Sequence, residues 1–452
     1  MSEVFGRIAA RIEGCRHPLL LILLVGIIIR MAVGPLAIVY DSDYWAIVIR
    51  NLETGNGLYG LEGYYYTPVW GYVLGGVAAF QNMFMDLGES AVRITEALFI
   101  EGCGPYFSAT IPSLALIYSV KFPLFCCDLI TAEVVRRLVL ERTGNGRRSL
   151  AAFALVFLSP VLLMSTGVIA MPDTISAMFA VLTIYCLRKG YPLIGGMTFA
   201  LAVLVKFFPA FMIFALVGYM VSNARREGRR PVADIALAVL GSATMTLLIF
   251  LPQIMDGSVA MCFQFLGDRS GFSEGDGILD MLIGSSRLIT YASVLVIAAY
   301  LGLKSLSADG DPFDTLMRNC LFTAALVLIY PPTTQYIVIL VPFLAYWIAA
   351  SDRGYMLGWK LLALGAPIYV LASVGSALMP LAVWAGFPDM GSAVHLFQTW
   401  YSPVFAGIAI GNMQFVIGGV LQCSAIIIIL LRLCGIDPRK LMRRRSVGDE
   451  QE

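Results

Sequence analysis

Long runs of apolar residues recur along the whole chain and constrain its fold more than any other feature. A helix that crosses a membrane needs roughly 20 apolar residues, because the hydrocarbon core is about 30 Å thick and each residue rises about 1.5 Å. Runs that approach this length are 18–39, 113–135, 150–168, 173–187, 232–252, 279–303, 319–333, 335–350, 361–385 and 404–431, and the run 191–222 is long enough for two short helices. The sequence therefore predicts an all-α, polytopic membrane protein with about 12 transmembrane helices.

The composition favours the same class and excludes others. Hydrophobic residues make up 59% of the 452 residues and charged residues only 13%, whereas soluble domains carry about 25% charged residues. So few charges cannot cover a water-exposed surface, which excludes a soluble enzyme. A net charge of +1 argues against a protein that binds nucleic acid through a basic face. The two histidines and nine cysteines form no recognisable zinc or disulfide framework.

The positions of lysine and arginine predict the orientation of the helices. Basic residues cluster at 7–16, 136–148, 188–189, 225–230, 304–318, 353–360 and 432–445. Because cytoplasmic loops are enriched in basic residues, these clusters place both termini in the cytoplasm, with 432–452 as a solvated tail. The segment 40–112 then forms a large first outer loop, in which 69–84 lies in the membrane interface or re-enters the membrane. We predict a single transmembrane domain over residues 1–452.

The first outer loop begins with two acidic residues. Asp41 and Asp43 are two residues apart, directly after the first predicted helix. A carboxylate at this boundary can accept a proton from a hydroxyl group, or it can help to bind a divalent cation. The alternative is that both acids simply cap an interfacial helix.

Aromatic residues follow the acids through the same loop. They are Tyr44, Tyr59, Tyr65, Tyr66 and Trp70. Flat apolar faces with polar edges suit sugar rings and lipid headgroups, which makes the loop a candidate sugar- and acceptor-binding region. An aromatic belt at the membrane interface has the same composition, so both interpretations stay open.

Lys206 is the most informative of the charges predicted at membrane depth, where a charge is costly. The basic clusters on either side of it leave room for two helices of about 15 residues, which reach only about 22 Å each. The turn at Lys206 should therefore lie below the outer surface, where a cation could hold a phosphate. A lysine that snorkels to the interface is an equal alternative. For Arg287 in its helix and Arg269 in the preceding loop, the same two alternatives apply: a ligand of a phosphate, or a side chain that extends to the interface.

Two aspartates also lie in or beside predicted helices. Asp128 is expected to pair with a neighbouring base, because an unpaired carboxylate is unfavourable within a membrane. Asp173 follows Met171 and Pro172 at a predicted outer turn, where it could cap the next helix.

Several short motifs occur in a particular order along most of the chain. They are Asp41-Ser42-Asp43-Tyr44, Gly57-Leu58-Tyr59, Tyr65-Tyr66-Thr67-Pro68, Lys121-Phe122-Pro123-Leu124-Phe125 with Asp128, Leu158-Ser159-Pro160 with Asp173-Thr174, Lys206-Phe207-Phe208-Pro209 and Thr334-Gln335-Tyr336. Together they resemble the GT-C superfamily of polyprenyl-phosphate-sugar-dependent glycosyltransferases. The nearest resemblance is to the PIG-M family of GPI mannosyltransferases and to related prokaryotic mannosyltransferases. Tyr65 stands where that family usually has arginine, and Ala170-Met171-Pro172 replaces its Arg-Gly before Asp173.

The resemblance implies an integral-membrane glycosyltransferase of glycolipid biosynthesis. It would move a hexose, with mannose as the first expectation, from a polyprenyl phosphate such as dolichol phosphate to a lipid or glycan acceptor, with inversion. It implies Asp41 or Asp43 as the general base, and Lys206 with Arg287 or Arg269 as ligands of the departing phosphate. The sugar and the acceptor would contact Tyr44, Tyr59, Tyr65, Tyr66, Trp70, Gln335 and Tyr336.

Cofactors, partners and location follow from the same resemblance. No cofactor is assigned, and a divalent cation at Asp41 and Asp43 stays open, because two carboxylates alone make an incomplete site. The expected partners are the polyprenyl donor, the acceptor and membrane lipids, with a small membrane subunit left open and no nucleic acid. The site would face the extracytoplasmic side of the plasma membrane in a prokaryote, or of the endoplasmic reticulum membrane in a eukaryote. The alternative from another class is a lipid-linked sugar flippase or transporter.

Overall fold

The structure is a computed structural model that describes most of the chain. The described residues are 17–37, 39–61, 64, 66–84, 91–94, 109–263, 278–307, 310–329, 333–351, 353–372, 385, 404–405 and 408–437. For 39–43, 91–94, 109–112, 278–288, 353, 404–405 and 408–411 only the backbone is described.

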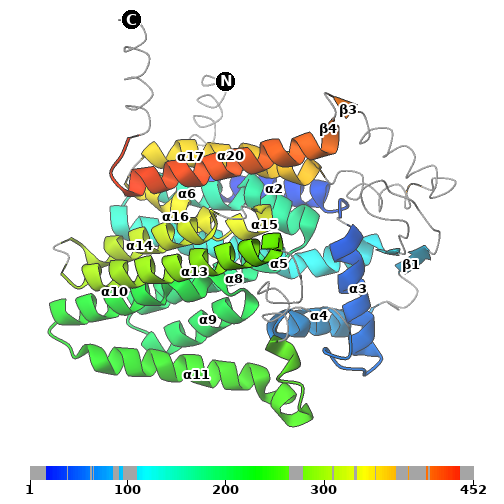
Figure 1. Ribbon diagram of the computed structural model, residues 1–452, viewed down its shortest axis with the longest axis horizontal. Coiled ribbons are helices and arrows are strands. Elements are labelled where there is room, and N and C mark those ends of the chain that lie inside the picture. Colours follow the sequence, from blue (N-terminus) through cyan, green and yellow to red (C-terminus); the bar gives the residue numbers. More distant parts are fainter. Residues whose placement is uncertain are drawn as a thin grey trace, which may run out of the picture.

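Helices make up almost all of the described chain, and most of them run side by side in one bundle (Figure 1). In chain order they are α2 (Pro18–Val33), α3 (Val39–Glu53), α4 (Pro68–Gln81), α5 (Leu114–Thr143), α6 (Gly146–Phe157), α7 (Pro160–Met164), α8 (Asp173–Arg188), α9 (Pro192–Val205), α10 (Ile213–Arg226), α11 (Pro231–Asp256), α13 (Ile278–Ser305), α14 (Pro312–Val327), α15 (Thr334–Ile337), α16 (Leu340–Ala350), α17 (Met356–Leu371) and α20 (Ile410–Leu433). A π-helical turn, Ser165–Ile169, follows α7, and a 3-10 turn, Phe208–Met212, precedes α10.

The predicted class of helical membrane protein is confirmed. Five helical stretches among the described residues are long and apolar enough to cross a membrane: Leu114–Thr143, Gly146–Ile169, Phe208–Arg226, Pro231–Asp256 and Asn412–Leu433. Shorter apolar helices accompany them, among them α2, α9, α16 and α17. The count of about 12 crossings stays a prediction.

Two short strand pairs are the only β-structure that we find in the described parts of the chain. β1 (Ala91–Ile94) pairs antiparallel with β2 (Ala109–Pro112), and β3 (Val404–Phe405) pairs antiparallel with β4 (Ile408–Ala409). The first pair lies in the predicted first outer loop, for which only interfacial helices were expected. Val, Ile and Thr in these segments favour extended backbone, which accounts for the pairing.

The ends of α5 and α6 show how the sequence sets the bundle. The side chain of Ser113 accepts a hydrogen bond from a backbone N–H of α5 at 3.1 Å, and Asn145 accepts two from α6 at 3.0 and 3.1 Å. Gly144 ends α5 in the left-handed conformation, with φ of 63°, which glycine adopts without strain. The chain therefore reverses within two residues, and the two helices pack as antiparallel neighbours.

Two glycines bring α9 and α11 into close contact. A Cβ atom at Gly196 would clash with the backbone of Ala238, and one at Gly241 would clash with the backbone of Leu193. Such packing through small residues is typical of helices in lipid. α9 has 14 residues and α11 has 26, so α9 ends at a shallower depth than its partner helix can reach. The short helix predicted before Lys206 is present.

Buried apolar residues form two main clusters. The larger one fills the bundle and includes Leu138 and Phe343. The smaller one includes Trp45, Trp70 and Leu124 and joins α3 and α4 to the bundle. α3 crosses the end of the bundle at which α5 begins (Figure 1), so the smaller cluster determines where α3 lies.

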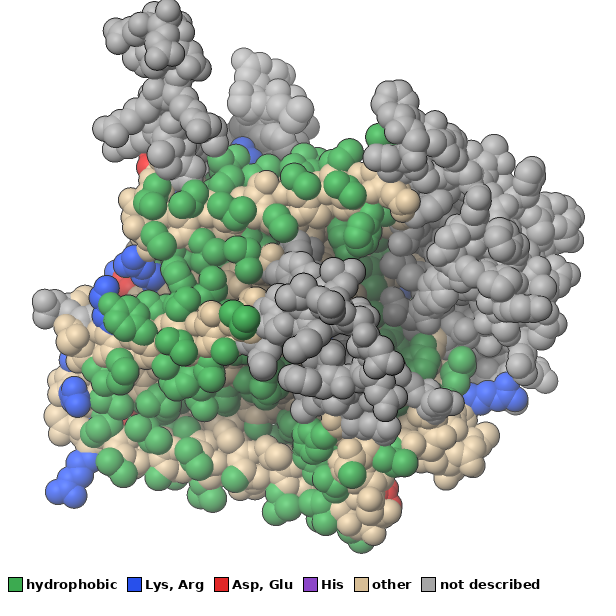
Figure 2. Space-filling view, viewed as in Figure 1, with side chains coloured by type: hydrophobic (Ala, Val, Ile, Leu, Met, Phe, Trp, Pro, Cys, Tyr) green, Lys and Arg blue, Asp and Glu red, His purple; other side chains and the backbone are tan. Residues whose placement is uncertain are grey.

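The outer surface of the bundle is apolar as well (Figure 2). On α11, the apolar residues Val232, Val239 and Leu247 are 73%, 62% and 57% exposed. On the face that Figure 2 shows, Lys and Arg side chains gather mainly at the left end of the bundle. Apolar sides with a basic end are expected of a bundle that sits in lipid with that end in the cytoplasm.

Candidate functional site

α3 carries both predicted acids. Asp41 and Asp43 lie in the first turns of this helix rather than in irregular chain, and their side chains lie outside the described residues. Position 45 follows position 41 by one helical turn, so the two positions share one face of α3. Position 43 is about 160° around the helix from position 45. The two acids therefore occupy nearly opposite faces of α3.

Trp45 fixes the face of α3 that it shares with position 41. It is 2% exposed, and its Nε1 donates a hydrogen bond of 3.1 Å to the carbonyl oxygen of Ala170. Its ring packs edge-on against the rings of Trp70 and Tyr66, with centroids 5.5 and 5.4 Å away. Ala170 has a left-handed backbone with φ of 60°, which is unfavourable for alanine. That strained turn presents the carbonyl to Trp45.

Lys206 lies just beyond α9, in extended backbone. Its Nζ is 3.4 Å from Oδ1 of Asp173, 4.6 Å from the ring centre of Tyr336 and 5.5 Å from that of Tyr66. Strong charge-assisted hydrogen bonds are shorter, about 2.7–2.9 Å, so this ion pair is loose. The side chain of Lys206 is 16% exposed. The cation therefore lies between two aromatic rings beside one acid and keeps some access to its surroundings.

The sequence placed Asp173 in one of the family motifs and at a helix start, but it gave this acid no role in the site. It is 5% exposed and begins α8, where the helix dipole favours a negative charge. Its pairing with Lys206 depends on the packing of α8 beside α9, which no local pattern in the sequence reports. Because Ala170-Met171-Pro172 replaces the family's Arg-Gly before this acid, the sequence gave no basis for assigning Asp173 a function.

Tyr66 connects α3 with Lys206. One neighbour of its ring is Trp45, and the other is the ammonium of Lys206. Its hydroxyl lies 3.7 Å from Sδ of Met171, in the same turn as Ala170. The structure thus brings the predicted acid helix and the predicted cation to one end of the molecule, joined by continuous contacts.

Hydrogen bonds hold the loop between α3 and α4 in place. The hydroxyl of Tyr59 donates to the carbonyl oxygen of Tyr66 at 2.9 Å, and Thr67 donates to the carbonyl oxygen of Leu204 near the end of α9. Burial raises the pKa of Tyr59 above its ordinary value, so this phenol stays protonated and remains a donor. The loop is thereby tied to the turn that carries Lys206.

The remaining aromatic candidates differ in their exposure. Tyr44 is half-buried, with its ring 5.7 Å from that of Trp45. Trp70 is 1% exposed and supports Trp45 from within the smaller cluster. In this conformation Trp70 packs in the core and presents no surface to a ligand.

The other candidates are placed only in part. Gln335 and Tyr336 lie on α15 and are half-buried, and Tyr336 packs edge-on against Phe208 at 5.0 Å. Arg287 lies on α13, where only its backbone is described, one turn before Tyr291. Tyr291 stacks on Phe211 of the 3-10 turn that follows Lys206, with centroids 6.2 Å apart. Tyr65 and Arg269 lie outside the described residues.

Lys121 holds the chain that leads into α3. It is 1% exposed, and its Nζ donates to the carbonyl oxygens of Gly34, Leu36 and Gly167 at 2.7, 2.5 and 2.7 Å. Three acceptors use all three donors of an ammonium group, so none is left for a ligand. Lys121 therefore positions the start of α3, a role that its sequence context did not indicate.

Arg30 and Asp128 form a second ion pair, closed from every side. Their side chains are 2% and 0% exposed, with NH2 and Oδ2 2.7 Å apart. Asp128 also accepts hydrogen bonds from Thr166 at 2.9 Å and from Thr174 at 2.6 Å. The expected pairing of Asp128 with a base is present, and it joins α2, α5 and α8.

No metal site is evident among the described side chains. They contain no group of three or more His, Cys, Asp and Glu residues placed to hold an ion. The side chains of Asp41 and Asp43 lie outside that description, so a divalent cation there stays a prediction.

One of three comparisons with known proteins, a family model, agrees with the motifs. A family model described as dolichyl-phosphate-mannose-protein mannosyltransferase matches residues 106–255, which include Lys121, Asp173 and Lys206. No curated protein matches the chain. The crystal structure of ArnT from Cupriavidus metallidurans bound to undecaprenyl phosphate is similar at 12% identity with a TM-score of 0.43, covering 91% of this chain and 78% of that chain. The family model confirms the resemblance to GT-C glycosyltransferases.

Proposed function

We propose that this GT-C chain transfers a hexose, with mannose as the first candidate, from a polyprenyl-phosphate donor to a lipid or glycan acceptor. The reaction is an inverting single displacement at the end of the bundle opposite its basic clusters, on the outer face of the membrane. The observation that carries this proposal is the environment of Lys206: a loosely paired cation between two tyrosine rings, in contact through Tyr66 with the face of α3 that carries position 41.

Lys206 is suited to hold the phosphate of the donor. Its ammonium lies next to the short helix α9, so a phosphate could reach it while the polyprenyl chain stays in lipid. The bond to Asp173 is long enough to be exchanged for a phosphate oxygen without loss of a strong interaction. Arg287 and Arg269 are further candidate ligands of the same group.

Asp41 is the favoured general base. Its position shares a face of α3 with Trp45, which is the side connected to Tyr66 and Lys206. Position 43 lies on nearly the opposite face, where it could orient the acceptor or bind a divalent cation. Proton transfer by a positioned carboxylate typically contributes about 10²–10⁴-fold in rate.

The chemical step balances as a direct displacement. The acceptor hydroxyl oxygen attacks the anomeric carbon of the sugar, and its proton passes to the carboxylate of Asp41. The bond between that carbon and the phosphate oxygen breaks, and polyprenyl phosphate leaves with the electron pair. Lys206 stabilises the negative charge that grows on the departing phosphate.

The rings around the cation provide the surfaces for the sugar. Tyr66 and Tyr336 already face the ammonium. Gln335 precedes Tyr336 on α15, and the ring of Tyr44 packs against Trp45, which contacts Tyr66. Aromatic faces pack on the apolar side of a hexose, and polar edges contact its hydroxyls. Tyr59 and Trp70 support these rings from behind, and Tyr65 remains a candidate contact.

The proposal is tested with purified protein in detergent micelles. The protein is given polyprenyl-phosphate mannose, and the products are separated into donor, free sugar and glycosylated acceptor from a membrane lipid extract. A transferase forms glycosylated acceptor there, whereas a flippase or transporter forms none, because micelles contain no second compartment. A faster transfer from the mannose donor than from glucose or arabinose donors supports mannose as the donor sugar. A chain that moves the donor across liposomes but transfers nothing in micelles is a transporter.

A further inference from the structure

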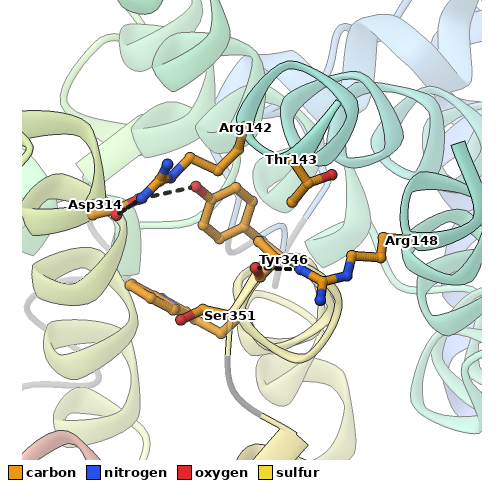
Figure 3. A pocket seen from close by; sticks show the side chains of 8 residues that line it. Arg142, Thr143, Arg148, Asp314, Tyr346 and Ser351 are labelled. Carbon is orange, nitrogen blue, oxygen red and sulfur yellow. Dashed lines mark hydrogen bonds and ion pairs between the residues drawn. The ribbon is translucent and has the colours of Figure 1, made fainter. Parts of the chain in front are cut away.

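A pocket of about 230 Å³ lies at the basic end of the bundle, at the far end of α5 from Lys121 (Figure 3). It lies among the ends of α5, α6 and α16, and its lining includes Arg142, Arg148, Asp314, Tyr346 and Ser351. Because α5 and α6 belong to stretches able to cross a membrane, their ends lie near the boundary between lipid and water. Nothing in the proposed transfer reaction uses this pocket.

One wall of the pocket is rigid and neutral. Arg142 contacts Asp314 through two hydrogen bonds, Nε to Oδ1 at 3.1 Å and NH2 to Oδ2 at 2.7 Å. The hydroxyl of Tyr346 donates to the same carboxylate at 3.2 Å. These bonds, drawn as dashed lines in Figure 3, fix the direction of the Arg142 fork and compensate its charge.

Arg148 lies on the other side of the pocket and forms no ion pair with any described residue (Figure 3). It is exposed, and its hydrogen bond from the guanidinium to the carbonyl oxygen of Ala350 is long, at 3.4 Å. Within the described part of the chain no carboxylate lies within ion-pair distance of it. Arg148 is therefore free to bind an anion, and a guanidinium fork matches the oxygens of a phosphate.

We propose that this pocket binds a phosphate group, with Arg148 as its main ligand and the hydroxyl of Ser351 beside it. The phosphate belongs either to a lipid headgroup of the inner leaflet or to a soluble phosphate compound. Basic pockets between helix ends on the cytoplasmic side bind lipid headgroups in other membrane proteins. The inference is independent of the proposed transfer, because it concerns the opposite end of the molecule and is measured as binding.

The test measures the unfolding temperature of the full chain in neutral detergent micelles during titration with a phosphate probe. One arm adds sodium phosphate against sodium chloride at equal ionic strength, and the other adds phosphatidic acid against phosphatidylcholine. The variants are Arg148→Gln, Arg148→Lys and, as a matched control, Arg147→Gln, which removes the same charge from the next residue. Circular dichroism of each variant checks that it is folded.

We expect Arg148→Gln to raise the half-saturating probe concentration roughly tenfold, Arg148→Lys to raise it less, and Arg147→Gln to change it less than about twofold. A response to phosphatidic acid alone identifies a lipid headgroup, and a response to inorganic phosphate alone identifies a soluble compound. The proposal is overturned if neither probe stabilises the wild type more than its control. Equal weakening by Arg148→Gln and Arg147→Gln also overturns it, because unspecific charge attraction would then explain the binding.

Discussion

Two ion pairs on either side of the turn between α7 and α8 differ in almost every respect. The pair of Arg30 and Asp128 is 2.7 Å long and fully buried, and two threonines complete its hydrogen bonds. The pair of Lys206 and Asp173 is 3.4 Å long, its lysine is 16% exposed, and tyrosine rings lie on the lysine. Thr174 and Asp173 are adjacent in sequence, yet each belongs to a different pair.

The contrast separates a structural charge from the charge that we propose to be functional. A charge at membrane depth is costly, so it is kept either to join helices or to bind a ligand. The Arg30 and Asp128 side chains are 2% and 0% exposed, so no ligand can reach them, whereas Lys206 has a longer ion pair that we propose a phosphate replaces. Depth in the membrane alone does not distinguish the two cases, but the exposure of the cation and the length of its ion pair do.

The largest effect on stability is expected when the buried ion pair of Arg30 and Asp128 is broken. Arg30→Met leaves Asp128 buried without its partner, which should lower the free energy of unfolding by about 3–5 kcal/mol. The measurement is thermal or denaturant unfolding in micelles, where reversible. The double variant Arg30→Met with Asp128→Leu should recover part of this loss, because it removes the uncompensated charge. A single variant as stable as the wild type would show that the pair does not hold the helices together.

Substitution of Lys206 should weaken the binding of the donor more than it destabilises the fold. Lys206→Met removes a charge-assisted contact to phosphate, worth about 1.5–3 kcal/mol, so the KM for the donor should rise roughly 10–100-fold. The unfolding temperature should fall less than in Arg30→Met, because the ion pair that is lost is longer and its lysine is partly exposed. Lys189→Met, at the basic end of the bundle, is the matched control and should keep the wild-type KM. An unchanged KM in Lys206→Met would remove Lys206 from the phosphate site.

A smaller effect is expected where α3 is anchored. Trp45→Phe keeps an aromatic ring but loses the hydrogen bond to Ala170, worth about 0.5–1.5 kcal/mol. If this bond orients α3, kcat should fall by about two- to tenfold while the KM for the donor stays constant. A rise in KM without a change in kcat would mean that Trp45 acts on the donor side instead.

The smallest effect should come from the ring nearest to the cation. Tyr336→Leu removes the ring face at 4.6 Å from Nζ of Lys206, worth about 0.5–1 kcal/mol, so donor affinity should fall about two- to fivefold. Tyr336→Phe keeps the ring and should match the wild type. If both variants lose affinity equally, the hydroxyl and not the ring face contributes.

The fold was largely predictable from the sequence, because it follows from the length of apolar runs and from the spacing of basic clusters. The short helix before Lys206 could be derived in this way, since too few residues separate its flanking arginines for two full crossings. The helical state of Asp41 and Asp43 could not, because the family signature does not report backbone conformation. The strand pair β1–β2 was missed for a similar reason: short β-branched segments in a loop do not reveal whether they find a partner.

The site was predictable only in its residue types and not in its pairings. No local sequence pattern indicates that Ala170 adopts a left-handed backbone. Yet this turn holds Trp45 of α3 through a hydrogen bond, and it leads into Asp173, which lies near Lys206. Trp70 has the composition of a sugar-binding residue, but packing against Trp45 buries it. Such outcomes depend on which helices become neighbours, and that is decided by packing over the whole bundle.

The most direct test of the central claim is the rate of sugar transfer by Asp41→Asn in micelles, under saturating donor. Because Asp41 is proposed as the general base on the face of α3 joined to Lys206, kcat should fall by about 10²–10⁴-fold while the protein stays folded. Glu53→Gln, at the exposed far end of the same helix, should keep the wild-type kcat. Wild-type kcat in Asp41→Asn, together with a large loss in Asp43→Asn, would contradict the account by placing the base on the opposite face of α3.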